Sequence, residues 1–587
     1  MSSQPSTNSV ISTKKPKKSL NSKPFPQKQI DLRLACLLVG IFAFLSTVRA
    51  QSNPLIDILS KELDREFEVL SKADDPVYYM DYQVMDVNQQ IIHTNLGSLV
   101  NSTHSRRRTA NVNIRIGDYQ RDNTHNVNEF NQQQFNAMPI ALETNEQAIS
   151  HMFWTMTNIK YQAAVEEYRQ ATAREDKTTT ADFTKEKPEV YIEEIEEKDL
   201  TRDTDEIEAR LKRLSALFLQ NENIIIGEVS LNREVKTKYF VSTEGSKVAH
   251  QIEYNFLSIS GNILDSEGAF IPLYQTYFAY DLDELPDEES LKADINRLIE
   301  TLVALQSAPL AEPYSGPAIL HPRAAGVFFH EIFGHRIEGS RLSSEYDSQT
   351  FKEKVGESVL PKSISVYMDP TIKELGDQAL LGHYLFDDEG VRAQKVNVVE
   401  GGILKNFLMT RKPLDSFVSS NGHARTEGGM APVSRQSNLI VEADRQLSED
   451  DLRKQLIKEC KKQGKKYGYY FVDVEGGFTN TNRFSPNAFN IMPTVVYKVY
   501  VDGRPDELVR GVDLIGTPLS MFAEIKAASD HRATFNGYCG AESGNVPVSA
   551  TAPGLLVRRI ETQKKMRETN EDEAPILSRP LSGKAND

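Results

Sequence analysis

The segment His330-Glu331-Ile332-Phe333-Gly334-His335 places two imidazoles and a carboxylate close together. Its histidines stand five residues apart, whereas in the H-E-x-x-H pattern they stand four apart on one helical face. At about 100° per residue, this spacing turns the second imidazole about 140° away from the first. One straight helix cannot aim both rings at one ion. Glycine commonly ends a helix, so we expect the helix to stop or bulge near Gly334, with Pro322 in its first turn.

These residue types are the ones that a hydrolytic zinc site needs. Zinc binds neutral imidazole readily, and a catalytic zinc site keeps one coordination position for water. A nearby carboxylate can accept a proton from that water, because the metal lowers the water's pKa. His330 and His335 are therefore candidate zinc ligands, and Glu331 is the candidate general base. A third protein ligand has to come from another part of the chain.

Several side chains are weaker candidates for the third ligand. Cys460 falls on the apolar face of a helix expected at 449–462, which predicts a core position. Glu338 follows His335 by three residues, and we expect it to support the site rather than bind the ion. His383 and His423 lie beside glycines in turn-like sequence and are expected to be surface histidines.

Cys539 is the stronger candidate. It lies in a glycine-rich segment, 537–544, which we expect to be a loop whose backbone can approach a metal closely. A thiolate is a strong zinc ligand, and zinc deprotonates a coordinating thiol. The chain has three cysteines, of which Cys36 lies in the amino-terminal leader. A disulfide between Cys460 and Cys539 is therefore the alternative to a zinc thiolate, and the residues alone leave both open.

The amino terminus predicts an export signal. A basic segment precedes an apolar run from Leu34 to about Val48, and Val48-Arg49-Ala50 has small residues at the cleavage positions. Because the run is shorter than the roughly 20 residues that span a bilayer, we expect a cleaved signal peptide over 1–50, an exported (periplasmic or secreted) protein and no stable membrane anchor. An uncleaved anchor is the alternative. The net charge of −15 argues against nucleic acid as a partner.

A chain of 587 residues is too long for one hydrophobic core and predicts two large domains. We expect an α+β fold. A mixed α/β domain with an antiparallel sheet covers 51–308, and a β-rich domain carrying the metal-site helix covers 309–560. The charged tail, 561–587, is expected to be disordered. Residue periodicity predicts helices at 54–72, 143–173, 204–219, 288–306 and 449–462, and strands at 77–87, 110–116, 224–280, 395–402, 438–442 and 493–502. Segment 175–203 is expected to be solvated, and 309–317 to be a linker.

The motif His330-Glu331-x-x-Gly334-His335-x-x-Glu338-Gly339, with a distant Cys539-Gly540, resembles the TldD/PmbA metallopeptidases, and in particular the TldD-like catalytic subunit. The resemblance covers roughly residues 310–560 well and the first domain more loosely. Further matching segments are Ser242-Thr243-Glu244-Gly245, Asp387-Asp388-Glu389-Gly390, Pro432-x-x-Arg435-x-x-Asn438, Gly476-Gly477, Leu514-Ile515-Gly516, Val546-Pro547-Val548 and Ala552-Pro553. The export signal, Arg336 and Ser340 depart from the family pattern.

The resemblance implies a zinc-dependent peptidase that hydrolyses unfolded or extended peptides. His330, His335 and Cys539 would be the zinc ligands and Glu331 the general base. Family members form two-fold dimers, so it implies a homodimer or a heterodimer with a PmbA-like paralogue. A non-catalytic subunit that binds peptides or serves as a scaffold is the alternative.

Two residues are candidates for substrate binding. Arg435 and Asn438 could orient a peptide or an oxyanion, and a structural salt bridge is the alternative. We expect the acidic segment 387–390 to form a turn, and an extended peptide to add to an exposed sheet edge near the glycine-rich strands.

Overall fold

The computed structural model describes residues 53–125, 137–173, 180–265, 268–344, 346–347, 349–484 and 488–565. The predicted signal peptide and most of the predicted tail lie outside these ranges. Within them, no helix combines the length and the apolar character needed to cross a membrane. Two large sheets with helices packed on them confirm the predicted α+β class.

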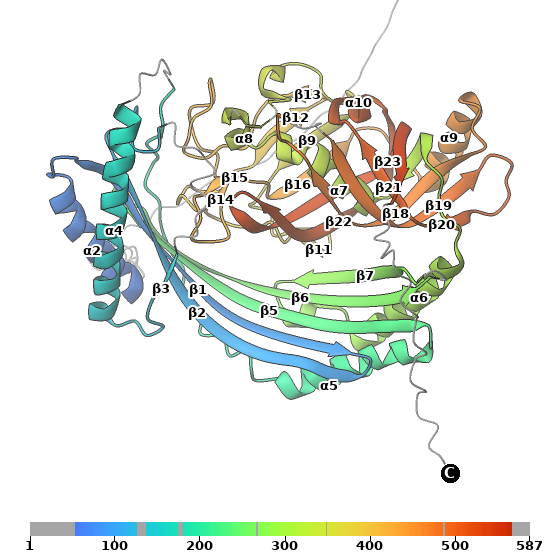
Figure 1. The fold of residues 1–587 in the computed structure, drawn as a ribbon, viewed down its shortest axis with the longest axis horizontal. Helices are drawn as coiled ribbons and strands as arrows, with labels where there is room; N and C mark the ends of the chain where they lie inside the picture. Colours follow the sequence, from blue (N-terminus) through green and yellow to red (C-terminus); the bar gives the residue numbers. More distant parts are fainter. Residues whose placement is uncertain are drawn as a thin grey trace, which may run out of the picture. The chain divides into compact units, whose positions relative to one another are not determined.

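The first sheet contains seven strands in the order β3-β2-β1-β5-β6-β4, with β7 paired to β6. Its pairings are antiparallel except for β4 with β6. The long strands β1, β2, β5 and β6 curve together in Figure 1. The strands are β1 (Val77–Asn95), β2 (Ser98–Ile116), β3 (Met138–Pro139), β4 (Val190–Ile192), β5 (Ile224–Ser242), β6 (Lys247–Leu264) and β7 (Phe270–Ala279).

Amphipathic helices cover this sheet, close to where periodicity predicts them. Their apolar faces form two clusters with the strands, one at α5 and α6 and the other at α2 and α4. Side-chain oxygens of Asn53, Asn145 and Asp287 accept backbone N–H groups at the starts of α2, α4 and α6, which fixes where these helices begin. The helices are α2 (Pro54–Leu70), α4 (Glu146–Thr172), α5 (Thr204–Ala216) and α6 (Glu288–Ser307), with short 3₁₀ turns η1 (Leu217–Gln220) and η2 (Leu282–Glu284).

The charged segment before α5 is more ordered than we predicted. Phe183 and Leu200 are each only 1% exposed, and β4 adds to the edge of β6. The composition suggested a solvated excursion because its charged residues outnumber these few apolar anchors. Residues 174–179 lie outside the described part of the chain.

The second sheet contains twelve strands, and part of it closes into a ring. The main order is β13-β12-β9-β16-β23-β21-β19-β18-β8, and β8 also pairs with β23, which joins the end of the row to its middle. β22 lies beside β23 and β17, and β20 beside β19. The strands are β8 (Tyr314–Leu320), β9 (Ile364–Met368), β12 (Val396–Glu400), β13 (Ile403–Leu404), β16 (Asn438–Ala443), β17 (Gln446–Leu447), β18 (Tyr467–Thr479), β19 (Phe489–Tyr500), β20 (Glu507–Val509), β21 (Val512–Gly516), β22 (Ile525–Ala541) and β23 (Gly544–Lys564).

The remaining elements are short, apart from α9. The predicted helix at 449–462 is confirmed as α9 (Glu449–Lys462), which starts at the capping hydroxyl of Ser448. Two predictions are wrong at their edges, because β8 begins inside the expected linker and β23 continues into the expected tail. The other elements are α7 (Pro322–Ile332), η3 (Gly334–Arg336), α8 (Gly339–Ser343), η4 (Lys352–Lys354), α10 (Pro518–Ala523) and the small pairs β10 (Glu374–Leu375) with β11 (Gln378–Ala379) and β14 (Ala424–Arg425) with β15 (Val433–Ser434).

Helix α7 is buried against the strands of the second sheet. Nearly all of its residues are shielded from solvent, and its apolar side chains join one core cluster with β8, β18, β19 and β23. Such all-round burial suits a helix whose sequence, Pro322–Ile332, is mostly apolar. The end of this helix is therefore fixed in place by packing on every side. The sheets divide near the predicted boundary at 308 and 309, although the domain limits stay a prediction.

Buried ion pairs join the first sheet to loops of the second. Nη2 of Arg411 lies 2.7 Å from Oε1 of Glu244, and both side chains are less than a tenth exposed. The Arg411 guanidinium also donates to the Thr184 carbonyl and lies 3.9 Å from the centre of the Phe183 ring. A second contact is formed at the predicted acidic turn, where Oδ1 of Asp388 lies 2.6 Å from Nζ of Lys238.

We expect Arg411→Ala to destabilise the protein by about 3–5 kcal/mol, because it leaves the Glu244 carboxylate buried without its cation. Urea unfolding monitored by fluorescence measures this loss. The matched control is Arg504→Ala, which breaks an exposed pair with Asp502 and should leave the unfolding midpoint unchanged. Equal midpoints for both variants would show that the buried pair does not stabilise the fold.

Candidate metal centre

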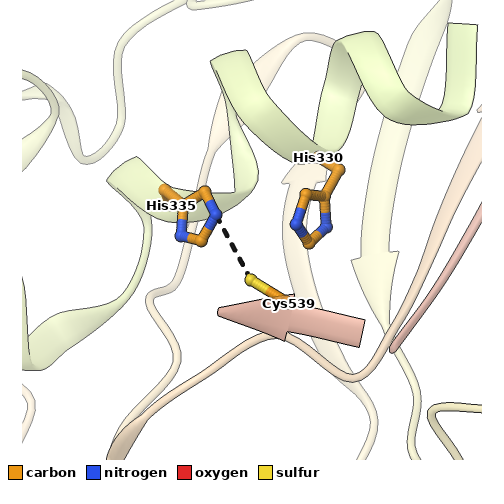
Figure 2. Close-up of side chains that lie close together, drawn as sticks. All are labelled: His330, His335 and Cys539. Carbon is orange, nitrogen blue, oxygen red and sulfur yellow. Dashed lines mark hydrogen bonds between the residues drawn. The ribbon is translucent and has the colours of Figure 1, made fainter. Parts of the chain in front are cut away.

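Three side chains from distant parts of the chain converge beside the end of α7. His330 lies on the last turn of α7, His335 on η3, and Cys539 on β22, as Figure 2 shows. Their candidate ligand atoms all lie within 4.8 Å of one another. Sγ of Cys539 is 3.4 Å from Nε2 of His335. Each of the three residues is less than a tenth exposed, so the cluster is an interior feature.

The end of α7 brings the two imidazoles together. The helix stops at Ile332, and the tighter 3₁₀ turn η3 carries His335 back toward His330, with the ring centres 5.0 Å apart. This confirms that the helix ends beside Gly334. The glycine allows a close approach, because a Cβ atom there would overlap the side-chain amide of Gln436 and displace it. The amide of Gln436 in turn donates to the carbonyl of His330 at 3.3 Å.

Cys539 is held on a hairpin rather than on a loop, so the expected glycine-rich loop is wrong in detail. β22 and β23 pair in register from Thr534 to Ala541, and the turn at 542–543 leads into Gly544, whose φ is +84°. Arg435 holds this hairpin in place through hydrogen bonds. Its guanidinium donates to the carbonyl of Cys539 at 2.5 Å, to the carbonyl of Gly544 at 3.0 Å and to the hydroxyl of Ser543 at 2.9 Å.

The donor set and its burial fit a zinc ion. Nδ1 of His330 is buried and has no hydrogen-bond partner among the described residues, an arrangement that costs free energy unless something binds there. Two imidazoles and a thiolate favour zinc over magnesium or calcium. Three protein ligands are the usual number for a catalytic zinc site, because the fourth position is left for water.

Comparisons with known proteins agree with this geometry. A family model described as the PmbA/TldA metallopeptidase C-terminal domain matches residues 313–564. A metalloprotease of Archaeoglobus fulgidus is 31% identical over 320 residues, which cover 54% of this chain and 68% of that protein. This chain belongs to the PmbA/TldD family of metallopeptidases. The resemblance seen in the sequence is thereby confirmed.

One further relative and one solved structure are informative. A zinc metalloprotease TldD homolog of Saccharolobus solfataricus is 27% identical over 289 residues, covering 49% of this chain and 60% of that protein. The crystal structure of TldE from Thermococcus kodakarensis matches 87% of this chain and all of its own chain, with a TM-score of 0.57 and 12% identity. At that identity the likeness shows a shared fold alone.

The electrostatics of this PmbA/TldD site favour a thiolate. Burial raises the pKa of the Cys539 thiol, but the His335 and His330 rings outweigh burial and bring it well below its usual range. Burial likewise lowers the pKa of His335, but the Cys539 sulfur and the Glu338 carboxylate outweigh it and raise the pKa. Each group therefore stabilises the charge of the other. A divalent cation at this position would stabilise the thiolate in place of the imidazolium.

Glu338 supports His335, as we expected. Its Oε2 atom lies 3.1 Å from Nδ1 of His335 and accepts from Nε of Arg341 at 2.7 Å, while the residue is fully buried. Burial alone would raise the pKa of Glu338, but His335 and Arg341 lower it to about 2. A carboxylate that fixes the outer nitrogen of a histidine ligand sets the orientation of the ring and increases its basicity.

The remaining sequence candidates are placed away from the centre. The disulfide alternative is wrong, because Cys460 and Cys539 are both free and Cys460 packs into a separate apolar cluster on α9. The prediction of surface histidines is also wrong. His423 is fully buried with Nε2 3.2 Å from the Ser437 hydroxyl, and His383 is half-buried against the Pro370 carbonyl. The neighbouring glycines lie in turns that the core covers.

Neither substrate-binding candidate lines the cavity beside His330, His335 and Cys539. Arg435 and Asn438 are both 0% exposed, and Asn438 donates to the carbonyls of Asp369 and Ile372. Nε of Arg435 lies 3.8 Å from Oε1 of Glu338, which is the structural salt bridge that we gave as the alternative. A role of either residue in substrate binding stays a prediction.

Two contributions to the site were not predicted from the sequence. Arg341 joins Glu338 to Glu542, whose Oε2 atom lies 2.6 Å from Nη2 of Arg341; its position three residues after Glu338 was a usable signal. Arg336 folds back and donates to the carbonyls of Glu331 and Ile332, at 2.8 and 3.1 Å. It thus satisfies carbonyls that the end of α7 leaves without helical partners. Arg336, which departs from the family pattern, therefore stabilises the carboxyl-terminal end of α7.

We expect Glu338→Gln to weaken zinc binding about 10–100-fold, because it removes the charge that fixes His335. Competition with a chromophoric chelator measures the affinity. Glu542→Gln is the matched control, since Glu542 binds Arg341 but does not contact His335. The supporting role of Glu338 fails if both variants bind zinc equally well.

Proposed function

We propose that this protein is a zinc-dependent peptidase that hydrolyses unfolded or extended peptides, with Glu331 as the general base. The observation that carries the proposal is the buried cluster of His330, His335 and Cys539 beside a carboxylate. Oε2 of Glu331 lies 4.0 Å from Nε2 of His335, which is within reach of a water held at the centre. Membership of a metallopeptidase family supports the same chemistry.

The shape of the site supports a peptide as substrate. The candidate ligands and Glu331 line a cavity of about 450 Å³. Strands of the first sheet form one wall through Phe256, Tyr274 and Thr276, and β18 and β22 of the second sheet form the other. The hydroxyl of Tyr274 donates to the Glu475 carbonyl and so links the two walls. A space bounded on both sides favours an extended chain over a folded protein.

Two strand edges in this cavity can bind a peptide backbone. Residues 476–479 of β18 pair with β19 alone, and residues 535–541 of β22 pair with β23 alone, among the strands that the structure describes. Residues of both segments line the cavity. A substrate added as a strand would be held by main-chain hydrogen bonds, with little dependence on its sequence. Phe478 and Tyr538, which are 58% and 48% exposed, supply apolar contacts for its side chains.

The residues divide the chemistry between them. His330, His335 and Cys539 would hold the ion. When bound, zinc polarises the scissile carbonyl and lowers the pKa of the attacking water. The Glu331 carboxylate accepts the proton of that water while the water oxygen bonds to the carbonyl carbon of the substrate. Glu331 then delivers the proton to the amine nitrogen as the carbon–nitrogen bond breaks.

Glu331→Gln should lower kcat about 10²–10⁴-fold while the protein keeps stoichiometric zinc, because the amide cannot accept the proton. His330→Ala and Cys539→Ser should lose both activity and zinc. Turnover of a dye-labelled unfolded polypeptide and metal analysis of the same samples measure these effects.

The alternative of a non-catalytic peptide-binding subunit makes a different prediction. Zinc-loaded wild type and Glu331→Gln would then both lack turnover and bind the polypeptide equally. Retention of zinc by Cys539→Ser would instead contradict the ligand set. Export and dimer formation, with itself or with a PmbA-like paralogue, stay predictions.

Gly477→Ala tests the placement of the general base without changing a ligand. A Cβ atom at Gly477 would lie 2.7 Å from Cγ of Glu331, so the carboxylate must move. We expect kcat to fall about 10–100-fold at full zinc occupancy, as for other small displacements of catalytic groups. In the Glu331→Gln background the same substitution should have no further effect, and an additive loss would contradict this explanation.

A further inference from the structure

A second group of metal-binding side chains lies at the other end of α7. His321 is the residue between β8 and α7, Glu449 is the first residue of α9, and His531 lies on β22. One ligand atom of each lies within 4.8 Å of the others. Three elements that are far apart in the sequence thus bring two imidazoles and a carboxylate to one point. None of these residues contributes to the buried centre described above.

The three side chains lack the partners that would give them another role. Nδ1 of His321 is buried and makes no hydrogen bond within the described chain. The side chains of Glu449 and His531 are exposed and form no hydrogen bond or ion pair with the residues that the structure describes. The nearby Arg323 is held by Asp473, with Nε 3.0 Å from Oδ1, so its charge is largely neutralised. The cluster can therefore receive a cation.

The backbone at His531 is adapted to this position. The pairing of β22 with β23 is interrupted between Ala528 and Arg532, so His531 lies in an irregular part of the strand. Irregularities of this kind re-aim side chains that a regular strand would direct elsewhere. The ring centre of His531 lies 6.2 Å from that of His321, a separation that an ion between the rings can span.

We propose that His321, Glu449 and His531 form a second divalent-metal site, which takes a transition-metal ion such as Zn²⁺. Imidazole ligands suit zinc, copper and nickel, and a carboxylate completes a three-ligand set with open positions for water. The ion would join the start of α7 to β22. These are the two elements that carry His330 and Cys539, so the second ion braces the framework of the first centre. Its two exposed ligands, Glu449 and His531, make it the more exchangeable of the two.

Cobalt titration of the metal-free protein separates the two sites. Co²⁺ bound to a thiolate gives a sulfur-to-metal absorption band, which reports only the site with Cys539, and equilibrium dialysis counts all bound ions. Wild type should bind two ions. His531→Ala should bind one and retain the full thiolate band, with the second affinity lowered more than about 100-fold, since loss of even an outer-sphere partner costs 10–100-fold.

Glu449→Gln is the second variant and should also lower the affinity of the second ion. His151→Ala removes an exposed histidine on α4 and should leave both ions bound. One ion in wild type, or two tightly bound ions in both His531→Ala and Glu449→Gln, would overturn the proposal. A missing thiolate band with the second ion still counted would contradict the Cys539 ligand instead, and would leave the second site standing.

Discussion

The contact between Cys539 and His335 is the constraint on which the rest of the site depends. It joins residues 204 positions apart, so it exists only if the closed ring of strands and the helix inside it are both correctly formed. Burying a thiolate is costly unless opposite charge lies beside it. The His335 imidazole provides that charge, Glu338 fixes its ring, and Arg341 and Arg435 balance Glu338 and hold the hairpin. The same contacts therefore stabilise the fold and position the candidate metal ligands.

Local features of the sequence predicted much of this arrangement. The five-residue histidine spacing with Gly334 predicted the end of α7, and the apolar spacing in 449–462 predicted α9 to the residue. The zinc-binding residue types and their likeness to a known family indicated which side chains to bring together. Such signals succeed because helix ends and periodic faces depend on neighbours along the chain.

Features that depend on distant contacts were not predictable in this way. His423 is buried because other elements cover a turn that looks exposed in sequence. Cys539 lies in a paired strand because β23 supplies its partner, and Phe183 anchors a charged segment through Arg411. In each case the decisive neighbour lies far away in the chain. Arg336 shows the same limit, since its departure from the family pattern acquires a meaning only when the carbonyls at the end of α7 are seen.

The isolation of Cys539 has a chemical consequence. The other cysteine that the structure describes, Cys460, is buried in a separate cluster, so it cannot shelter the sulfur in a disulfide if the ion departs. Thiolates are the form that oxidants and alkylating agents attack. The sulfur lines the cavity that we assign to the peptide, so small electrophiles would enter by the path of the substrate. Bound metal would then protect the sulfur, and loss of the metal would expose it to alkylation and oxidation.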